Sequence, residues 1–547
     1  GPYESVITEF PFFTFLYADL HAHLIAMPLA LVSLSIALSL VKRAGGSERR
    51  GWTSILAQLV PLFLWSLTIG AMRTTNTWDV PPHLLVALGT LVIAEFSRRG
   101  RLSWRMLWAV AWQFGLVFLL SWWVLYWPFW DNYGAFYTSV ELWNGTRTSV
   151  AAYLVVHGLF LFSILSYLLA RVFGRSDDLR PDPLLHRLRL TFRYLGQHRR
   201  LREAARIVGV RGVPVSVLFW IALAILILVE LFLLVPGLVS FTRANAQVTE
   251  VGAYTYRGLT VLALGLPIAL VGLLLLFRPG LRASERWWAY LVLLGLAMTL
   301  GVEIIVVQGD IGRMNTVFKF YLQVWLMWGV AAAAALAWMV PRLRRWQFGR
   351  GLWLISLLVL VLFATLYPPL ATLAKIEDRF DTSQGPGLDG WTYMETANYW
   401  DPNGQRYDLK WDLEAIRWLL DNIVGSPVIL EGHTPEYRWG ARYSINTGLP
   451  TVLGWNWHQR QQRAAADDQE VWTRAKDIAR IYDEPIPALI EPMLEKYGVR
   501  YIVVGPLEHS YYAPEGLAKF EQMAAQGKLR AVFRNQGVTI YEVPSSE

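Results

Sequence analysis

Long apolar segments constrain the fold of this chain more than any other feature of its sequence. Of the 547 residues, 54% are hydrophobic, and they occur in blocks. A segment of roughly 17–25 apolar residues can cross a bilayer as a helix, and by this criterion we count about ten. They are Leu24–Val41, Ile55–Met72, Leu84–Phe96, Met106–Tyr126, Val150–Leu169, Pro214–Leu234, Leu259–Phe277, Trp288–Val307, Phe320–Val340 and Leu352–Tyr367. The pattern predicts an α-helical, multi-pass protein of the cell membrane, with the lipid bilayer as its main partner.

The net charge of +8 is concentrated in alternate loops between these segments. Five loops carry the excess of Arg and Lys: Lys42–Arg50, Ser97–Arg105, Arg171–Arg211, Arg278–Arg286 and Pro341–Arg350. Because cytoplasmic loops are enriched in basic residues, these five are predicted to face the cytoplasm. The other loops, and the chain after Tyr367, are then predicted to lie outside. A charge distributed in this way indicates membrane topology, and no nucleic-acid partner is expected.

The sequence changes character near residue 370. Residues 1–370 are predicted to form a transmembrane domain, and residues 371–547 an extracytoplasmic α/β domain in which strands and helices alternate. Cysteine is absent, so this domain has no disulfide bonds to stabilise it. The expected strands are Ser426–Glu431, Tyr501–Val504 and a hairpin of Leu529–Phe533 with Val538–Val543, and the expected helices are Ile486–Tyr497 and Leu517–Gln526.

Asp19, His21 and His23 stand directly before the first apolar segment. Ionisable groups at a membrane are costly unless they have partners or a function. The three residues could bind a divalent metal ion, the only cofactor that the sequence suggests, or supply a general base with an imidazole partner. A spacing of two directs side chains apart on a helix, so one ion would require unwound backbone. Residues that cap a membrane helix are an equally good interpretation. Asp19 is the better candidate for a catalytic carboxylate.

Other polar residues gather in the loops predicted to face outward. The acids that could be catalytic beside Asp19 are Glu9, Asp79 and Glu303, although ion pairing inside a helix bundle explains Glu303 slightly better than catalysis does. Cations near Asn315 would suit a phosphate or pyrophosphate, because Arg binds phosphate bidentately and Lys acts as a point charge. The candidates for substrate binding in these loops are His21, His23, Arg73, Asn76, Trp78, Asp310, Arg313, Asn315 and Lys319.

The C-terminal region contains a stretch rich in aromatic and hydrogen-bonding residues, TPEYRWGARYSINTGLPTVLGWNWHQRQQR. Aromatic faces flanked by hydrogen-bonding groups suit sugars, although stacking within a domain core would explain the tryptophans alone. The candidates for binding are Arg438, Trp455, Trp457, His458 and Arg463.

Several motifs resemble those of the YYY membrane protein family (Chlor_Arch_YYY), whose function is not established. They are ITEFPFFTFLYADLHAH, TTNTWDVP, GRMNTVFKFY, TGLPTVLGWNWHQRQQR and KYGVRYIVVGPLE, and the resemblance extends over essentially the whole chain. The Tyr-Tyr-Tyr-x-Gly motif of the family is missing, since Tyr511-Tyr512 is followed by Ala513. In the family this motif belongs to an N-terminal region. The chain is therefore expected to be a fragment, with that membrane region as its missing partner.

The layout of the family is similar to that of GT-C glycosyltransferases, which transfer a sugar from a polyprenyl-phosphate carrier to an acceptor on the outer face. The resemblance implies Asp19 as general base, Arg313 and Lys319 as ligands of the carrier phosphate, and Trp455–Arg463 as the acceptor site. The usual first-loop acid of that superfamily would precede Gly1, so Asp19 could be an assisting acid. A transporter or lipid flippase, a metal-dependent membrane hydrolase built on Asp19, His21 and His23, and an inactive scaffold are the alternatives.

Overall fold

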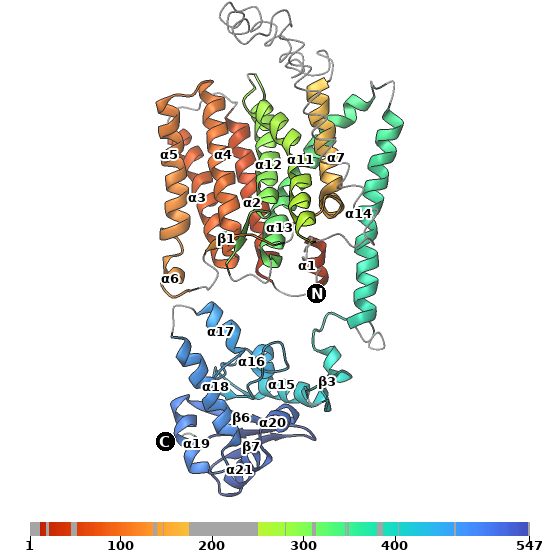
Figure 1. Ribbon diagram of the computed structural model, residues 1–547. Helices are drawn as coiled ribbons and strands as arrows, with labels where there is room; N and C mark the ends of the chain where they lie inside the picture. The colour runs from red at the N-terminus through yellow and green to blue at the C-terminus, as the bar shows by residue number, and fades with distance from the viewer. Residues whose placement is uncertain are drawn as a thin grey trace, which may run out of the picture. The chain divides into compact units, whose positions relative to one another are not determined.

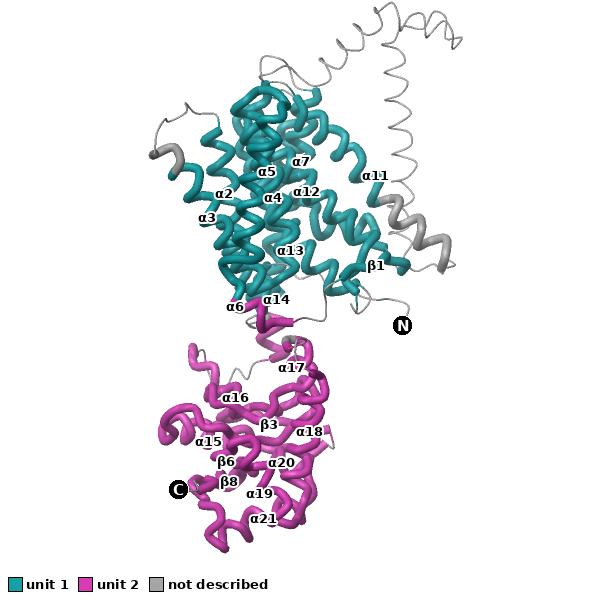
Figure 2. Tube along the Cα trace, turned by 90° about the vertical axis from the view of Figure 1, so that its left-hand side faces the viewer, with its two compact units in different colours: residues 1–127, 137–371 teal, residues 128–136, 372–547 magenta. Residues whose placement is uncertain are grey.

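The computed structural model divides the chain into two compact units (Figure 2). Unit 1 comprises residues 1–127 and 137–371, and unit 2 comprises residues 128–136 and 372–547. The structure describes residues 11–17, 21–44, 52–134, 139–145, 147–173, 250–278, 280–308, 313–344, 346, 349–379, 385, 387–402, 404–463 and 467–544.

Unit 1 is a helical bundle (Figure 1). Its main described helices are α2 (Ala22–Arg43), α3 (Trp52–Thr75), α4 (Val80–Arg99), α5 (Trp104–Leu119), α7 (Val150–Phe173), α11 (Glu250–Leu276), α12 (Ala283–Gly301), α13 (Met314–Leu343) and α14 (Arg350–Arg379). Short elements join them: α1 (Pro11–Tyr17), the 3-10 turn η1 (Thr77–Asp79) and the π-helical turn η2 (Leu120–Val124). The short helix α6 (Trp127–Trp130) starts at Trp127, and its other residues belong to unit 2. Strands β1 (Val140–Leu142) and β2 (Ile305–Val307) pair antiparallel.

Seven helices within the described residues are long and apolar enough to cross a membrane. They correspond to seven of the predicted segments and include α2, α3, α4, α5 with η2, α7, α13 and α14. Of α11, Val261–Leu276 is a shorter apolar helix, and α12 carries Glu285 and Arg286 in its first turn. The prediction of one span over Trp288–Val307 is wrong at its end, because α12 stops at Gly301 and β2 follows. Pro214–Leu234 lies outside the described residues.

Close helix contacts in unit 1 depend on small residues. A Cβ atom on Gly89 of α4 would lie 2.2 Å from the ring of Tyr290 in α12, and one on Gly295 of α12 would lie 2.2 Å from Trp328 in α13. These glycines let bulky aromatic side chains reach the neighbouring backbone, a common way to pack helices in membranes. The core of the bundle is continuous around α12, which contacts α4, α11 and α13.

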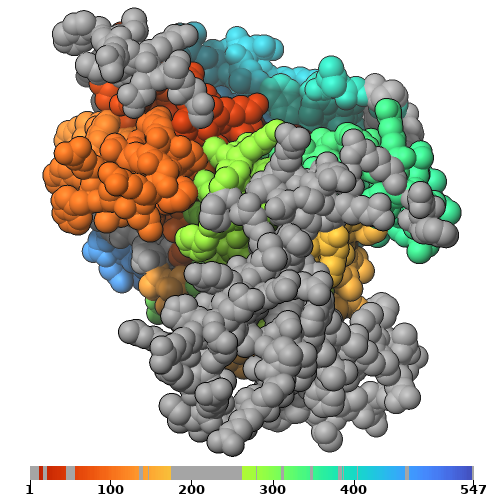
Figure 3. Space-filling view, turned by 90° about the horizontal axis from the view of Figure 1, so that it is seen from above, coloured from red at the N-terminus to blue at the C-terminus, as the bar shows by residue number. Residues whose placement is uncertain are grey.

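The arginine-rich ends of the helices in unit 1 lie together. Glu95, near the end of α4, pairs with Arg98 and Arg99. The Arg286 guanidinium at the start of α12 lies 4.9 Å from the ring centre of Phe96 in α4. Figure 3 looks onto this end and shows the orange segment that contains α4 and α5 beside the yellow-green segment of α12. The packing is thus consistent with the common location predicted for the basic loops.

Unit 2 contains a four-stranded sheet in the order β5-β6-β8-β7. Strands β5 (Val428–Leu430) and β6 (Val499–Val504) are parallel, whereas β8 (Thr539–Glu542) pairs antiparallel with both β6 and β7 (Arg530–Arg534). Strands β3 (Asn398–Trp400) and β4 (Arg406–Asp408) form a separate hairpin. The helices are α15 (Lys410–Asn422), α16 (Arg442–Thr447), α17 (Asn456–Gln462), α18 (Asp468–Asp483), α19 (Pro487–Lys496), α20 (Pro506–Tyr511) and α21 (Pro514–Ala525).

Alternation along the strands gives this sheet two covered faces. Ile502 packs in one core with residues of α18, α19 and α21, whereas Val503 packs in the other with residues of α15. Successive side chains of a strand point to opposite faces, so helices on both sides bury the sheet. The strands, the closing hairpin and the two helices predicted for this region are confirmed, with ends that differ by a few residues.

Candidate functional site

One end of the bundle in unit 1 gathers polar side chains from five separate segments. It is formed by α1, the start of α2, η1, the paired strands β1 and β2, and the first turns of α13 (Figure 1). The arginine-rich ends of α2, α4 and α13 are at the opposite ends of those same helices. The described polar residues fall into two clusters, one around Glu303 and one around Asp79.

Glu303 forms a buried ion pair with Arg313. The Arg313 Nη1 atom lies 2.8 Å from Glu303 Oε1, and both side chains are at most 6% exposed. Thr148 donates to both carboxylate oxygens, from its hydroxyl at 2.5 Å and from its backbone N–H at 3.0 Å. Arg313 also donates to Val302 O and to the Thr148 hydroxyl oxygen. A carboxylate with this many partners is held in one position, so these contacts favour a structural role over that of a general base.

Asp79 is a buried carboxylate with fewer hydrogen-bond partners than Glu303. It ends η1, is 1% exposed, and accepts a hydrogen bond from Asn76 Nδ2 at 2.9 Å on Oδ1. Its Oδ2 atom has no hydrogen-bond partner among the described residues. His23 and Lys319 are the two basic groups that act on it electrostatically. Asp79 therefore keeps hydrogen-bonding capacity on Oδ2, and the half-buried Lys319 acts on it electrostatically.

A chain of buried hydrogen bonds extends from this cluster into the bundle. Trp65 Nε1 donates to Ser33 Oγ at 2.8 Å, and Ser33 Oγ lies 2.9 Å from His83 Nδ1. His83 Nε2 lies 3.0 Å from Gln323 Oε1. Because the Gln323 oxygen can only accept, His83 donates to it from Nε2, and in this tautomer His83 Nδ1 accepts the proton of the Ser33 hydroxyl. The chain leaves the buried Gln323 amide nitrogen without a hydrogen-bond partner among the described residues.

The other predicted residues of this end differ in their surroundings. His21 is exposed, and its ring centre lies 5.1 Å from that of His23. His23 is buried, and its Nε2 atom lies 3.0 Å from the Thr14 hydroxyl. Trp78 contacts Phe320 edge-on, and Arg73 lies 3.7 Å from the ring centre of Trp122 in η2. Asn315 is half-buried in the first turn of α13.

Three predicted site residues, Glu9, Asp19 and Asp310, lie outside the described residues. No group of three His, Asp or Glu side chains suited to a metal ion occurs in the described part of the chain. The metal site proposed for Asp19, His21 and His23 includes Asp19, which lies outside the described residues, so this site stays a prediction. The catalytic roles proposed for the acidic residues also stay predictions.

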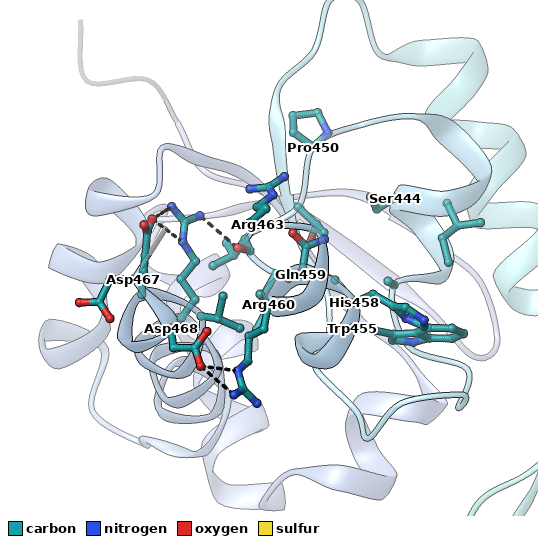
Figure 4. Close-up of a pocket in the computed structure, with 18 residues that line it drawn as sticks. Ser444, Pro450, Trp455, His458, Gln459, Arg460, Arg463, Asp467 and Asp468 are labelled. Carbon is teal, nitrogen blue, oxygen red and sulfur yellow. Dashed lines mark hydrogen bonds and ion pairs between the residues drawn. The ribbon is translucent and has the colours of Figure 1, made fainter. Parts of the chain in front are cut away.

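Unit 2 contains a pocket of about 460 Å³ between α16, α17 and α18 (Figure 4). Three of the predicted residues, Trp455, His458 and Arg463, line it. Trp457 and Arg438 are exposed outside its lining. Trp455 immediately precedes α17, whereas Trp457 lies within the helix.

A cluster of buried charges supports the wall of this pocket. Arg442, at the start of α16, pairs with Asp412 at 3.0 Å and with both oxygens of Glu508 at 3.2 and 2.9 Å. Glu431 accepts the backbone N–H groups of Tyr443 and Ser444, each at 2.9 Å. Burial raises the pKa of Glu431 to about 7, against the opposing effect of Arg442 and these N–H groups. Burial by itself would raise the pKa of Glu508, but Arg442 and the backbone N–H groups of Gly432 and Gly505 together lower it.

Several residues that complete these clusters are not distinctive in the sequence. Thr148 looks like an ordinary loop residue, and its role depends on the distant Glu303. Gln323 had a visible signal, since a polar amide within the apolar segment Phe320–Val340 requires a partner. Glu431, Asp412 and Glu508 gave no signal, because only the fold brings them to Arg442.

The fold and the polar bundle end define a helical, multi-pass membrane protein. The chain belongs to a family of uncharacterized membrane proteins, DUF2298, whose profile matches residues 3–328. Membership of an uncharacterized membrane protein family is thereby confirmed, whereas the assignment to the YYY family stays a prediction. A comparison with curated protein sequences gives no significant match.

Two solved structures from Archaeoglobus fulgidus are similar to the chain. One is an oligosaccharyltransferase tethered to an acceptor peptide with the NVT sequon, at 15% identity and a TM-score of 0.30, covering 96% of this chain and 56% of that one. The other is the oligosaccharyltransferase AglB with an inhibitory peptide and a dolichol-phosphate, at 13% identity and a TM-score of 0.26, covering 88% and 58%. The chain thus spans less than three fifths of their lengths, and TM-scores of this size do not by themselves establish a common fold.

Proposed function

We propose that the protein is a membrane glycosyltransferase that transfers a sugar from a polyprenyl-phosphate carrier to an acceptor on the outer face. The observation that supports this proposal is the cluster of Lys319 and His23 around buried Asp79 at one end of the bundle. A lysine at a membrane edge is suited to the phosphate of a lipid carrier, whose prenyl chain remains in the bilayer. The arginine-rich ends at the other side orient this cluster outward by the positive-inside rule.

In the proposed reaction, a carboxylate removes the proton from an acceptor hydroxyl. The hydroxyl oxygen attacks the anomeric carbon in line and inverts it, and the bond from that carbon to the phosphate oxygen breaks. The carrier phosphate leaves with the electron pair, and Lys319 stabilises its negative charge. Asp19 is the proposed base, since it lies two residues before the exposed His21. Asp79 keeps Lys319 charged and positioned.

The Glu303–Arg313 pair has a supporting role in this proposal. It joins the segment just before β2 to the residue before α13, the helix that carries Asn315 and Lys319. Asn315 and Lys319 are four residues apart on α13, so they occupy the same helix face. The ion pair thus fixes the helix start from which both side chains would meet a phosphate.

A transfer assay tests the proposal directly. Membranes from cells that make the protein, and from cells that lack its gene, are incubated with polyprenyl phosphates carrying a panel of labelled sugars. We expect label to reach a new acceptor only when the protein is present. Asp19→Asn should lower the rate by about 100-fold or more, the usual contribution of a general base. The matched Asp378→Asn, at an exposed position of α14, should retain full activity. Undiminished transfer by Asp19→Asn, or no protein-dependent transfer at all, would disprove the assignment.

A lipid transporter is the second candidate, because one observation favours it. Transporters carry polar groups in the membrane interior. The hydrogen-bond chain through Ser33, His83 and Gln323 places such groups well inside the helices of the bundle. Protein-dependent movement of a labelled polyprenyl phosphate across vesicles, without sugar transfer, would support this function in place of the transferase.

A further inference from the structure

We infer that the pocket of unit 2 is a binding site for a neutral saccharide. Its volume of about 460 Å³ is in the range of roughly 300–1,000 Å³ typical of ligand sites. This inference does not depend on the transferase proposal, because a saccharide site could serve a membrane protein of any activity.

An aromatic platform forms one wall of the pocket. The rings of Trp455 and His458 are stacked with their centres 5.4 Å apart, and Figure 4 shows them side by side. Tyr437 packs against both, at 5.3 and 5.6 Å. Tyr437 adopts a φ of 62°, which is unfavourable for a side chain of this size. The apolar face of a pyranose ring can lie on such a surface, and the platform is held in place before a ligand arrives.

Polar groups without protein partners surround the platform. The indole nitrogen of Trp455 and the hydroxyl of Thr451 are buried, and neither has a hydrogen-bond partner among the described residues. Buried polar atoms are nearly always satisfied in proteins, so these two atoms mark a wall of the pocket whose hydrogen-bonding capacity the described residues leave unused. The exposed Arg463 also lines the pocket, and its guanidinium forms no hydrogen bond or ion pair with the residues that the structure describes.

The charges of the lining balance, which favours a neutral ligand. Three arginines and three acids line the pocket: Arg460, Arg463, Arg474, Asp467, Asp468 and Glu470. Arg460 pairs with Asp468 at 2.7 Å, and Arg474 pairs with Glu470 at 2.7 Å. Asp467 accepts the backbone N–H of Gln469 and caps α18. A strong anion would need an excess of cations. Paired Arg and acid groups instead present fixed donors and acceptors, which suit the hydroxyl groups of a sugar.

The pocket is tested by titrating the full chain in detergent with neutral oligosaccharides of glucose, mannose, galactose and N-acetylglucosamine, and with oligogalacturonate as the anionic probe. Trp fluorescence and calorimetry report binding. We expect at least one neutral probe to bind more tightly than the anionic one. Trp455→Ala should weaken that binding about tenfold, as for the loss of an aromatic contact. Trp457→Ala, an equivalent change two residues away and outside the lining, should leave binding unchanged.

Three results would overturn the inference: preference for the anionic probe, no binding of any neutral probe, or equal binding by the Trp455→Ala variant. Arg463→Met keeps the platform intact and should also weaken binding of the neutral probe. Circular dichroism of each variant establishes that unit 2 remains folded. Loss of sugar transfer in the assay of the proposed function would leave this result unaffected, so the two proposals fail independently.

Discussion

The Asp79 cluster of unit 1 and the Arg442 cluster of unit 2 combine the same chemical groups in different ways. Arg442 reaches two carboxylates, and Glu508 further accepts the backbone N–H groups of Gly432 and Gly505. Asp79 has one oxygen without a partner in the described residues, and its neighbour Lys319 is only half-buried. Arg442 is paired with opposite charges at ion-pair distance, and such pairing stabilises one structure, whereas a buried carboxylate without an ion pair in the described part of the chain can act on a ligand. The two clusters should therefore respond differently to mutation.

The largest effect is expected for Arg442→Met. Removing the guanidinium leaves Asp412 and Glu508 buried without their cation, which costs about 3–5 kcal/mol in free energy of unfolding. Chemical denaturation of the purified protein measures this change, with the cleavage of unit 2 by a protease as the readout of its unfolding. Arg417→Met removes an exposed pair with Glu395 and should cost at most about 1 kcal/mol. Equal losses for the two variants would show that the buried cluster does not stabilise the unit.

A smaller effect concerns the pH dependence of stability. The pKa of Glu431 is raised from 4.5 to about 7, so the folded state keeps a proton that the unfolded state releases. The stabilisation is complete below pH 4.5 and is lost as the pH rises to about 7, up to about 3 kcal/mol in total.

Glu508 has a lowered pKa and contributes in the opposite direction, with stability lost as the pH falls. Glu431→Gln removes only the Glu431 contribution. Unfolding at pH 5 and at pH 7.5 should therefore show a smaller decrease for the variant than for the wild type. Parallel curves for the two proteins would contradict a protonated Glu431.

The smallest expected effect is on ligand binding in unit 1. Lys319→Met should weaken binding of a short-chain polyprenyl phosphate about tenfold, or about 1.4 kcal/mol, with little change in the unfolding transition. Lys42→Met, at the exposed other end of α2, is the matched control. If the Lys319 variant binds normally but unfolds readily, then the Asp79 cluster is structural like that of Arg442, and the contrast between the two regions disappears.

Much of the fold was predictable because periodicity and length are local properties. Seven of the predicted membrane segments and the strand–helix pattern of the C-terminal region follow from them. The end of α12 was not predictable, since Ile305–Val307 is as apolar as a helix interior and becomes a strand only by pairing with β1. For the site, topology correctly indicated that Asp79, Glu303, Arg313 and Lys319 share one end of the bundle. Which acid pairs with which base could not be read from their order.

The amino-acid sequence is sufficient to predict that this protein crosses a membrane many times, because a long apolar helix has few other stable environments. The positions of the basic loops along the chain also follow from the sequence. The pairing of Arg313 with Glu303, the electrostatic effect of Lys319 and His23 on Asp79, and the place of Trp455 rather than Trp457 in a pocket depend on the three-dimensional fold. Whether a charged side chain is buried, and which group it pairs with, depends on residues far apart in sequence. Burial and pairing together distinguish a charge held by protein partners from one that can bind a ligand.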